Sequence, residues 1–430
     1  MFSSRASQFV NFFFMYNIPT SSSRRVVIIG GGFGGLAAAK ALRESGLQVV
    51  MIDSNNCHQF QPLLYQVATS GLEPTAIAFP LRSILRGRKD FHFRMAYVTG
   101  VDVERCVVMT ETGELEYDYL VVAAGADTNY FGMSNIEAAS MPLKSIDEAL
   151  ALRNRIYRSL ESAQKCECVE EQERLLNFVI VGGGATGVEL AGALAELRNR
   201  VLPRDFPDLD FSRMKVWLLN ASDRLLEAFS EKSSEKCLTD LRAMGVDVLV
   251  EAKVSDYADG AVIYNDGQRI ESANLIWASG IIANKFEGLD NTARGRRIVI
   301  DEYCRVGERV FAIGDIAINN ESPLPQVAQV AIQQGRNVGR NVINMERGRA
   351  LEKFVYKNKG SMATIGRNRA VAEIGRLRVS GFAAWVLWLF VHLLFILGFR
   401  NKLLVMWDWA WSYVTHDQPL RSIIEAKKRR

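Results

Sequence analysis

Two glycine-rich turns constrain what this chain can fold into more than any other feature. The first follows the β-branched run 26–29 and precedes the helix-forming segment 36–43; it reads Gly30-Gly31-Gly32-Phe33-Gly34-Gly35. A second strand, 48–52, then ends at Asp53, about 18 residues after the last glycine. This is the complete βαβ pattern of a dinucleotide site, in which glycines let a pyrophosphate reach a helix N-terminus and the acid accepts the ribose hydroxyls.

The same pattern recurs about 150 residues later. A short apolar strand, 178–181, leads into a strong helix former, 188–197, through Gly182-Gly183-Gly184-Ala185-Thr186-Gly187. One fingerprint alone is weak evidence, but two in the same strand–turn–helix context predict two nucleotide sites. The alternative, two glycine-rich turns inside some other α/β sheet, leaves Asp53 unexplained. We therefore expect an α/β fold with two Rossmann-like domains.

Three further strand ends connect these domains. Two buried strands finish in small residues, at Ala124-Gly125 and at Gly280, as is needed where the chain leaves a nucleotide domain close to a bound cofactor. A third, 310–313, ends in Gly314-Asp315. Behind two fingerprints, this Gly-Asp resembles the flavin-binding signature of the two-dinucleotide-binding-domain flavoproteins, in which the Asp meets the ribityl chain.

Longer motifs resemble one family within that superfamily. Four motifs are similar to those of the type II NADH dehydrogenases, the non-pumping NADH:quinone oxidoreductases. They are the run His58-Gln59-Phe60-Gln61-Pro62-Leu63-Leu64-Tyr65-Gln66, the second fingerprint with Glu189, the Gly314-Asp315 pair and the Ala-Gln-x-x-x-Gln motif at 328–333. The likeness covers residues 24–415. It implies a non-covalent FAD on the first domain, NADH on the second, and a membrane quinone as electron acceptor in a respiratory chain.

The resemblance also assigns site residues. For FAD it implies Gly30, Gly32, Phe33, Gly34, Gly35, Asp53, Gln61, Ala124, Gly125, Gly314 and Asp315, and for NAD(P)H it implies Gly182, Gly184, Gly187, Glu189, Asn220 and Gly280. Glu189 is expected near the nicotinamide and the quinone, with a role in proton delivery or substrate positioning. Its plainer interpretation is a carboxylate stabilised at a helix start.

Gln329 and Gln333 are the other two candidates for the reaction. They are four residues apart, so they share one face if 326–342 is helical, and their amides can meet the flavin pyrimidine and a quinone carbonyl. The alternative is a polar helix face in solvent. The apolar neighbours Ala328, Ala331 and Ile332 argue against that alternative.

Asn220 departs from the family pattern. It stands at the end of the strand 215–219, where an acid binds the adenosine ribose of NADH. Without a carboxylate a 2′-phosphate is no longer repelled, so an NADPH-preferring quinone reductase stays open. Arg224 is the nearest cation for such a phosphate, but NADH-specific members carry an Arg about there too. We keep NADH ahead of NADPH.

The cysteines bear on two other hypotheses. Six cysteines without a regular framework favour a reducing compartment, and no Cys-x-x-Cys pair or His/Cys cluster provides a metal site. Cys57 alone leaves open a pyridine-nucleotide disulfide or peroxide reductase, although cysteine is also a common buried residue. A non-catalytic flavoprotein that senses NADH is the third alternative.

Positive charge gathers at the C-terminal end. Residues 376–430 hold nine Lys/Arg and three acids, against a net charge of +4 for the whole chain, together with five of the seven tryptophans. Basic charge with aromatic and apolar runs indicates a membrane surface, whereas no nucleic-acid reading motif is present. The apolar run 381–399 is long enough to span a bilayer once. We favour helices that lie in one leaflet, because a span would put the basic end, 427–430, opposite the NADH domain.

These inferences give a domain plan. We expect a flexible extension at 1–23, a discontinuous FAD-binding domain at 24–145 and 281–345, an NAD(P)H-binding domain at 146–280, and a C-terminal membrane and quinone region at 346–430 with an apolar helix at 381–399. The enzyme would attach to the membrane on its cytoplasmic or matrix-equivalent side, without pumping protons. A homodimer stays open, and so does the identity of the quinone.

Overall fold

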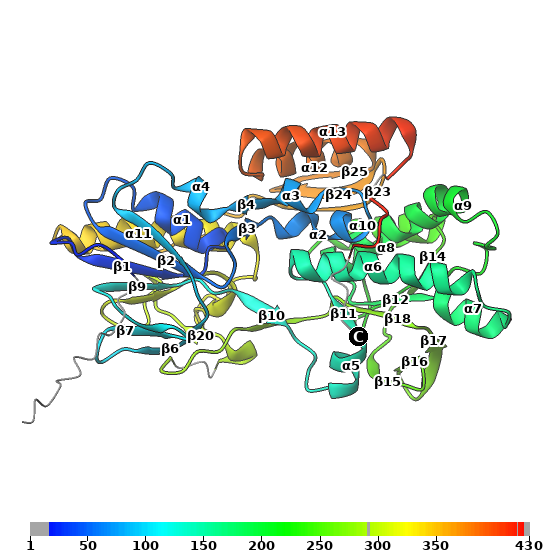
Figure 1. Cartoon of the computed structure of the whole chain (residues 1–430), viewed down its shortest axis with the longest axis horizontal. Helices are drawn as coiled ribbons and strands as arrows, with labels where there is room; N and C mark the ends of the chain where they lie inside the picture. The colour runs from blue at the N-terminus through cyan, green and yellow to red at the C-terminus, as the bar shows by residue number, and fades with distance from the viewer. Residues whose placement is uncertain (1–16, 290–292, 419, 425–430) are drawn as a thin grey trace, which may run out of the picture. The chain divides into compact units, whose positions relative to one another are not determined.

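The computed structural model describes residues 17–289, 293–418 and 420–424, and these form two compact units (Figure 1). Unit 1 comprises the described parts of residues 1–58, 80–126 and 282–356, and unit 2 those of 59–79, 127–281 and 357–430. Most of the expected N-terminal extension and the basic end at 427–430 lie outside the described residues. Ile18, by contrast, is buried, and Gln48 Nε2 donates to the carbonyl of Pro19, so residues 18 and 19 pack on unit 1 and are not loose.

Unit 1 is built on a five-stranded parallel sheet of the order β21-β9-β1-β2-β5. Its strands are nearly continuous apolar runs because helices cover the sheet. Their bounds are β1 Arg25–Ile29, β2 Gln48–Asp53, β5 Phe91–Met95, β9 Tyr119–Val122 and β21 Val310–Ala312. An antiparallel meander adds apolar residues to the same core, with β6 Val98–Asp102, β7 Val107–Thr110 and β8 Gly113–Glu116.

Two helices of unit 1 approach each other unusually closely. These are α1, Phe33–Ala41, and α11, Ala328–Glu346, which run side by side in Figure 1. A Cβ at Gly335 would collide with the carbonyl of Gly34, and one at Gly339 would lie 2.5 Å from Cβ of Ala41. Glycine at these positions therefore lets the two backbones touch. Helix α11 begins two residues later than the predicted 326, and it extends four residues beyond 342.

Unit 2 repeats the parallel arrangement in the order β11-β18-β12-β13-β14. The strands are β11 Met141–Pro142, β12 Phe178–Val181, β13 Val216–Leu219, β14 Val246–Leu249 and β18 Asn274–Trp277. Its main helices are α6 Ile146–Ala163, α8 Ala185–Glu196 and α10 Glu231–Ala243. A second meander follows, with β15 Val254–Ala258, β16 Ala261–Tyr264 and β17 Gln268–Glu271. The α/β prediction with two dinucleotide-type sheets is confirmed.

The last part of unit 2 is an antiparallel sheet capped by two helices (Figure 1). Its strands are β23 Ser361–Gly366, β24 Arg369–Ile374 and β25 Leu377–Ser380, and the helices are α12 Phe382–Phe395 and α13 Phe399–Thr415. Strand β23 packs directly on α8, because a Cβ at Gly192 would collide with the carbonyl of Ile365.

The apolar run 381–399 is not one helix, contrary to prediction. It is extended at Ile396 and turns at Gly398, which has a φ of 79°. A Cβ at Gly398 would collide with the ring of Phe79, and the Asn401 amide donates to the carbonyls of Thr75 (3.1 Å) and Ala78 (3.2 Å). These contacts fix the start of α13, and hydropathy alone does not reveal them. Among the described residues, no helix combines the length and the apolar character that crossing a bilayer requires.

The remaining elements are short connections. The strands are β3 Cys57–Gln59, β4 Ala78–Pro80, β10 Ala126–Thr128, β19 Ile281–Ala283, β20 Ile298–Val299 and β22 Ala317–Ile318. The helices and single turns are η1 Gln61–Leu63, α2 Leu64–Ala68, α3 Pro74–Ile77, α4 Leu81–Ile84, α5 Ser134–Ala139, α7 Val169–Leu176, η2 Leu197–Val201, α9 Leu202–Asp205, η3 Arg294–Arg296 and η4 Gly314–Ile316.

Candidate active site

The glycine turn of unit 1 leaves the N-terminus of α1 open. Gly32 is the N-cap residue, no side chain caps the helix, and a Cβ at Gly32 would meet nothing within 4 Å. The first backbone N–H groups of α1 therefore face open space, which suits a phosphate. Gly34 and Gly35 serve packing instead, since Gly35 lies against the carbonyl of Gly30. The ring edge of Phe33 meets His58 at 4.9 Å between centroids.

Asp53 closes this turn from the end of β2. Its Oδ2 accepts a hydrogen bond from the Gly31 N–H at 2.5 Å, and its Oδ1 accepts one from the Asn55 N–H at 2.7 Å. Burial raises the pKa of Asp53, and these backbone hydrogen bonds oppose the rise. Each carboxylate oxygen has further acceptor capacity, so the residue fits the role of receiving ribose hydroxyls.

The other unit 1 candidates gather at the same edge of the sheet. Strands β1, β9 and β21 are neighbours in parallel register, so the residues after each strand, including Gly30, Ala124–Gly125 and Gly314–Asp315, follow at their carboxyl ends. Gly125 and Gly314 have φ values of 70° and 75°. The structure thus brings together every FAD candidate except Gln61, which lies in unit 2, is exposed, and donates to the carbonyl of Lys144 at 3.1 Å.

Two glutamines that the sequence did not single out hold the Gly314–Asp315 turn. The N–H of Gly314 donates to Gln334 Oε1 at 2.7 Å, and Gln326 Nε2 donates to the carbonyl of Asp315 at 2.8 Å. Gln334 is 4% exposed. Gln329 and Gln333 are half-buried in the first turns of α11 and share one face of that helix. The signal for Gln334 was its place beside Gln333, but only the fold shows which amide points at the turn.

The glycine turn of unit 2 has the same open geometry. Gly184 is the N-cap of α8 without a side-chain cap, and a Cβ there would meet nothing within 4 Å. Gly182 has a φ of 119°, and Gly187 lies against its carbonyl. Gly280 has a φ of 77° beside the ring of Phe131. These features fit a second pyrophosphate at a helix N-terminus.

Asn220 takes the place of Asp53 in unit 2. Its Oδ1 accepts the Gly183 N–H at 2.9 Å, while its Nδ2 donates to the carbonyls of Arg224 (2.9 Å) and Ser222 (3.3 Å). The Arg224 guanidinium donates to the carbonyls of Phe229 (3.1 Å) and Glu227 (2.9 Å). Both side chains therefore hold the loop 222–229 in place.

Glu189 is buried on α8, two residues past Gly187. The Thr364 N–H donates to its Oε1 at 3.3 Å. Burial raises the pKa of Glu189 to about 8, against the opposing effect of the N–H groups of Thr364 and Trp388. The Trp388 indole nitrogen favours the carboxylate in this way although its geometry falls short of a hydrogen bond to any described residue. A carboxyl group that holds its proton near neutral pH is suited to general acid catalysis.

An aromatic wall surrounds this carboxyl group. Trp388 stacks on His392 with centroids 3.9 Å apart and meets Tyr65 at 6.4 Å, and Trp409 Nε1 donates to Gln66 Oε1 at 2.7 Å. Burial lowers the pKa of His392 to about 4, so its ring is neutral and packs against Trp388. Three of the aromatic residues, Tyr65, Trp388 and Trp409, line a cavity of about 100 Å³ together with Glu189, Glu196 and Arg367.

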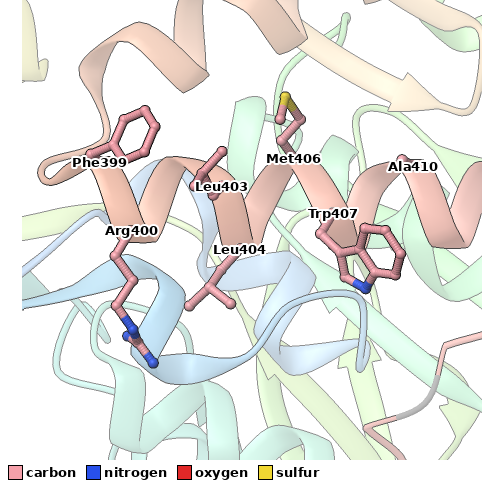
Figure 2. Close-up of a pocket in the computed structure, with 7 residues that line it drawn as sticks. All are labelled: Phe399, Arg400, Leu403, Leu404, Met406, Trp407 and Ala410. Carbon is pink, nitrogen blue, oxygen red and sulfur yellow. The ribbon is translucent and has the colours of Figure 1, made fainter.

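The outer surface of α12 and α13 is apolar. Phe382, Phe390, Phe399, Trp407 and Val414 are all more than half exposed. Figure 2 shows Arg400, Leu404 and Trp407 pointing to one side of α13 and Met406 to the other, and these residues help to line a shallow hollow of about 570 Å³. An exposed apolar surface of this kind marks an interaction site.

The described part of the chain contains no cluster of three His, Cys, Asp or Glu that would hold a metal ion. None of the six cysteines, Cys57 included, forms a disulfide.

Comparison with known proteins places this geometry among flavoenzyme-like folds. The sequence profile of the pyridine nucleotide-disulphide oxidoreductases matches residues 24–335, and that of the NDH2 C-terminal domain matches residues 358–415. Two proteins of Mycobacterium tuberculosis named type II NADH:quinone oxidoreductase, Ndh and NdhA, are 37% and 38% identical to this chain; the alignments cover 89% of it, and 87% and 86% of the relatives.

Solved structures share the fold. NDH2 from Plasmodium falciparum in complex with NADH superposes with a TM-score of 0.86 at 20% identity, covering 94% of this chain and 100% of that one. The sulfide:quinone oxidoreductase of Aquifex aeolicus gives a TM-score of 0.70 at 16% identity, covering 91% and 96% of the two chains.

Proposed function

The chain belongs to the type II NADH:quinone oxidoreductases, and we propose that it performs this reaction with FAD held by unit 1, NADH bound by unit 2, and Glu189 as a proton donor to the quinone. A bound flavin accepts a hydride from NADH and releases two electrons to a second carrier. No nucleophile is required of the protein, which needs only to hold the carriers, orient them and deliver protons. No proton pumping accompanies the reaction.

Unit 1 has the residues to hold FAD without a covalent bond. The open N-terminus of α1 at Gly32 binds the pyrophosphate, and Asp53 accepts the hydroxyls of the adenosine ribose. The Gly314–Asp315 turn, fixed by Gln334, receives the ribityl chain. Gln329 and Gln333 present amides from α11 to the flavin and to the quinone.

Unit 2 binds NADH in preference to NADPH. The open N-terminus of α8 at Gly184 takes the pyrophosphate. Asn220 offers its remaining Oδ1 lone pair to the ribose, because both of its N–H groups already donate to loop carbonyls. Arg224 donates to two carbonyls as well, so it is not positioned for a 2′-phosphate.

The proposal for the reaction itself depends on Glu189. Its burial beside the aromatic wall and its raised pKa, about 8, keep the carboxyl group protonated at neutral pH. Such a group gives its proton to a quinone oxygen as electrons arrive, and the indole of Trp388 and the N–H of Thr364 then stabilise the carboxylate.

The apolar surface of α12 and α13 delivers the quinone from the lipid. Exposed Phe399, Trp407 and Val414 suit insertion into one leaflet, and Arg400 and Lys402 suit anionic headgroups. The enzyme is thus monotopic, attached on the side from which NADH arrives. The thiol of Cys57 takes no part in the reaction.

Steady-state oxidation of NADH and of NADPH by the purified flavoprotein, each with and without a soluble quinone, tests the function. We expect quinone-dependent oxidation and a kcat/KM that favours NADH. A flavin that is reduced by NADH and then stays reduced with quinone would refute the proposal and leave the NADH-sensing alternative. A Cys57→Ser variant with full quinone reductase activity excludes thiol chemistry.

A further inference from the structure

Helix α8 carries a second, half-buried acid that the reaction above does not use. Glu196 follows Glu189 by seven residues, or two helical turns, so both lie on one face of α8, about 10 Å apart along the axis. Both line the cavity of about 100 Å³ described above. Ala193 lies between them in the helix and lines the same cavity.

Glu196 has the surroundings of a proton-exchanging group. Its Oε1 accepts the backbone N–H of Arg367, and no ion pair within 4 Å joins it to a described residue. Burial raises its pKa, while the charges of Arg367, Arg200 and Arg369 lower it. Tyr65 of α2 lines the same cavity and interacts electrostatically with both acids. The proton affinity of Glu196 is thus set by opposing influences.

The guanidinium of Arg367 is committed elsewhere. It donates to the carbonyls of Ser412 (2.7 Å) and Tyr413 (3.1 Å), at the end of α13, and contacts the ring of His416. In turn, the ring nitrogen Nε2 of His416 lies 3.4 Å from the guanidinium nitrogen Nη1 of Arg200. Arg200 is exposed and Glu196 itself is only half-buried, so the Glu196 end of the cavity lies near bulk water.

Two buried polar atoms indicate that the cavity holds water. Gln418 Oε1 and Trp388 Nε1 have no hydrogen-bond partner among the residues that the structure describes, and both side chains line the cavity. Buried polar groups are nearly always satisfied, and a polar space of this size accommodates a few water molecules. Such waters would join Glu196 to Glu189, which direct contact cannot do over two helical turns.

We propose that Glu196 relays protons from bulk water to Glu189 through water in this cavity. The inference rests on the proposed function, in which NADH, one proton and a quinone give NAD⁺ and a quinol. When an O–H bond of Glu189 breaks and an O–H bond of the quinol forms, a cavity water protonates the Glu189 carboxylate. Glu196 restores that water by losing its own proton, and then takes one from solvent.

Glu196→Gln is the first test, since the amide oxygen still accepts the Arg367 N–H but cannot relay a proton. In stopped-flow experiments we expect flavin reduction by NADH at the wild-type rate and reoxidation by a soluble quinone slowed about tenfold or more. The solvent isotope effect on reoxidation should rise, and formate should restore the rate. Glu196→Asp should recover part of it. Exposed Glu235 on α10 provides the matched control, Glu235→Gln.

Ala193→Leu tests the same path while keeping both acids. The larger side chain fills the space between them, so it should also slow reoxidation and leave flavin reduction unchanged. Wild-type reoxidation rates and an unchanged pH profile in both variants would overturn the relay while leaving the quinone reductase function intact. If the wild-type protein itself fails to pass electrons to quinone, the proposed function fails first.

Discussion

The two glycine turns differ at the residue that closes each of them. In unit 1 the Gly31 N–H donates to the carboxylate of Asp53, and in unit 2 the Gly183 N–H donates to the amide oxygen of Asn220. A carboxylate only accepts hydrogen bonds, whereas the amide also donates two, and Asn220 uses both to hold the carbonyls of Ser222 and Arg224. The closing side chain of unit 1 thus only accepts hydrogen bonds, whereas that of unit 2 also donates to carbonyls of its own loop.

The same substitution at the two N-caps should abolish binding of a different nucleotide in each unit. Gly32→Val and Gly184→Val each place a side chain in open space, so we expect both variants to fold. Each blocks the N–H groups that hold a phosphate, which costs about 3 kcal/mol or more, or over about 100-fold in affinity. Gly32→Val should be purified without flavin, and Gly184→Val should keep its flavin but resist reduction by NADH. Absorbance spectra and NADH titrations measure both; the same loss in both variants would contradict the assignment of one nucleotide to each unit.

Helix α8, after the glycine turn of unit 2, carries the buried acid Glu189 with a raised pKa, whereas helix α1, after the turn of unit 1, carries no acid. Because the proton donor must be neutral, quinone-dependent turnover should fall as pH rises through about 8. Glu189→Gln should slow flavin reoxidation by about 100-fold and remove that limb of the pH profile. Stopped-flow reoxidation from pH 6 to 9 gives the result, and a limb that persists in the variant would assign the pKa to another group.

The same acid makes a prediction about stability. The folded chain holds the Glu189 proton up to about pH 8, whereas the unfolded chain releases it near the ordinary value of 4.5. Within this window the folded state binds more protons, so its stability falls as pH rises. Thermal unfolding should therefore show that the stability of Glu189→Gln rises relative to that of the wild type as the pH increases from 5 to 8. A constant difference across that range would show that the pKa is not raised.

Unit 2 alone carries the apolar helices, so membrane binding should depend on it. Trp407 and Trp411 are 65% and 45% exposed on α13. Replacing both by Ala removes about 2–4 kcal/mol of interfacial burial and should weaken binding to anionic vesicles about tenfold or more. Tyr97→Ala, at a side chain 64% exposed in unit 1, is the control. Equal losses in co-sedimentation would mean that the membrane surface is not on α13.

Giving unit 2 the closing acid of unit 1, by Asn220→Asp, should have the smallest effect. Asn220→Asp still accepts the Gly183 N–H, but it places a carboxylate oxygen instead of an N–H group against the two loop carbonyls. Loss of these hydrogen bonds costs about 1–3 kcal/mol of folding stability. We expect a Tm lower by about 5 °C and a several-fold larger preference for NADH over NADPH. Differential scanning fluorimetry and kcat/KM for both nucleotides measure this. An unchanged preference would show that Asn220 does not face the ribose.

Local patterns predicted much of this fold. The strand–turn–helix units at Gly30 and Gly182 follow from glycine spacing and β-branched runs, because their geometry depends on neighbours in sequence. The break in the apolar run at 396–398 did not follow, since it depends on Phe79, Thr75 and Ala78, far away in the chain. An unbroken hydropathic run has no signal for a turn imposed by packing.

The site was predicted unevenly for the same reason. Glu189 could be named from its position after a fingerprint, but its raised pKa comes from burial against residues about 180 to 200 positions later. Gln334 was passed over for its neighbour Gln333, because helical phase alone does not show which amide meets Gly314. From the sequence alone, Glu196 would be interpreted as an ordinary acid near a helix end. Only the fold shows that it lines the same cavity as Glu189.

The most direct test of this account is a double-mixing stopped-flow experiment on the wild-type flavoprotein and Glu189→Gln. NADH is added first and a soluble quinone second, while flavin absorbance is followed. The account predicts that NADH bleaches the flavin equally fast in both proteins, and that quinone restores the absorbance rapidly only in the wild type. A flavin that quinone fails to reoxidise in the wild type, or reoxidises equally fast in both, would contradict it.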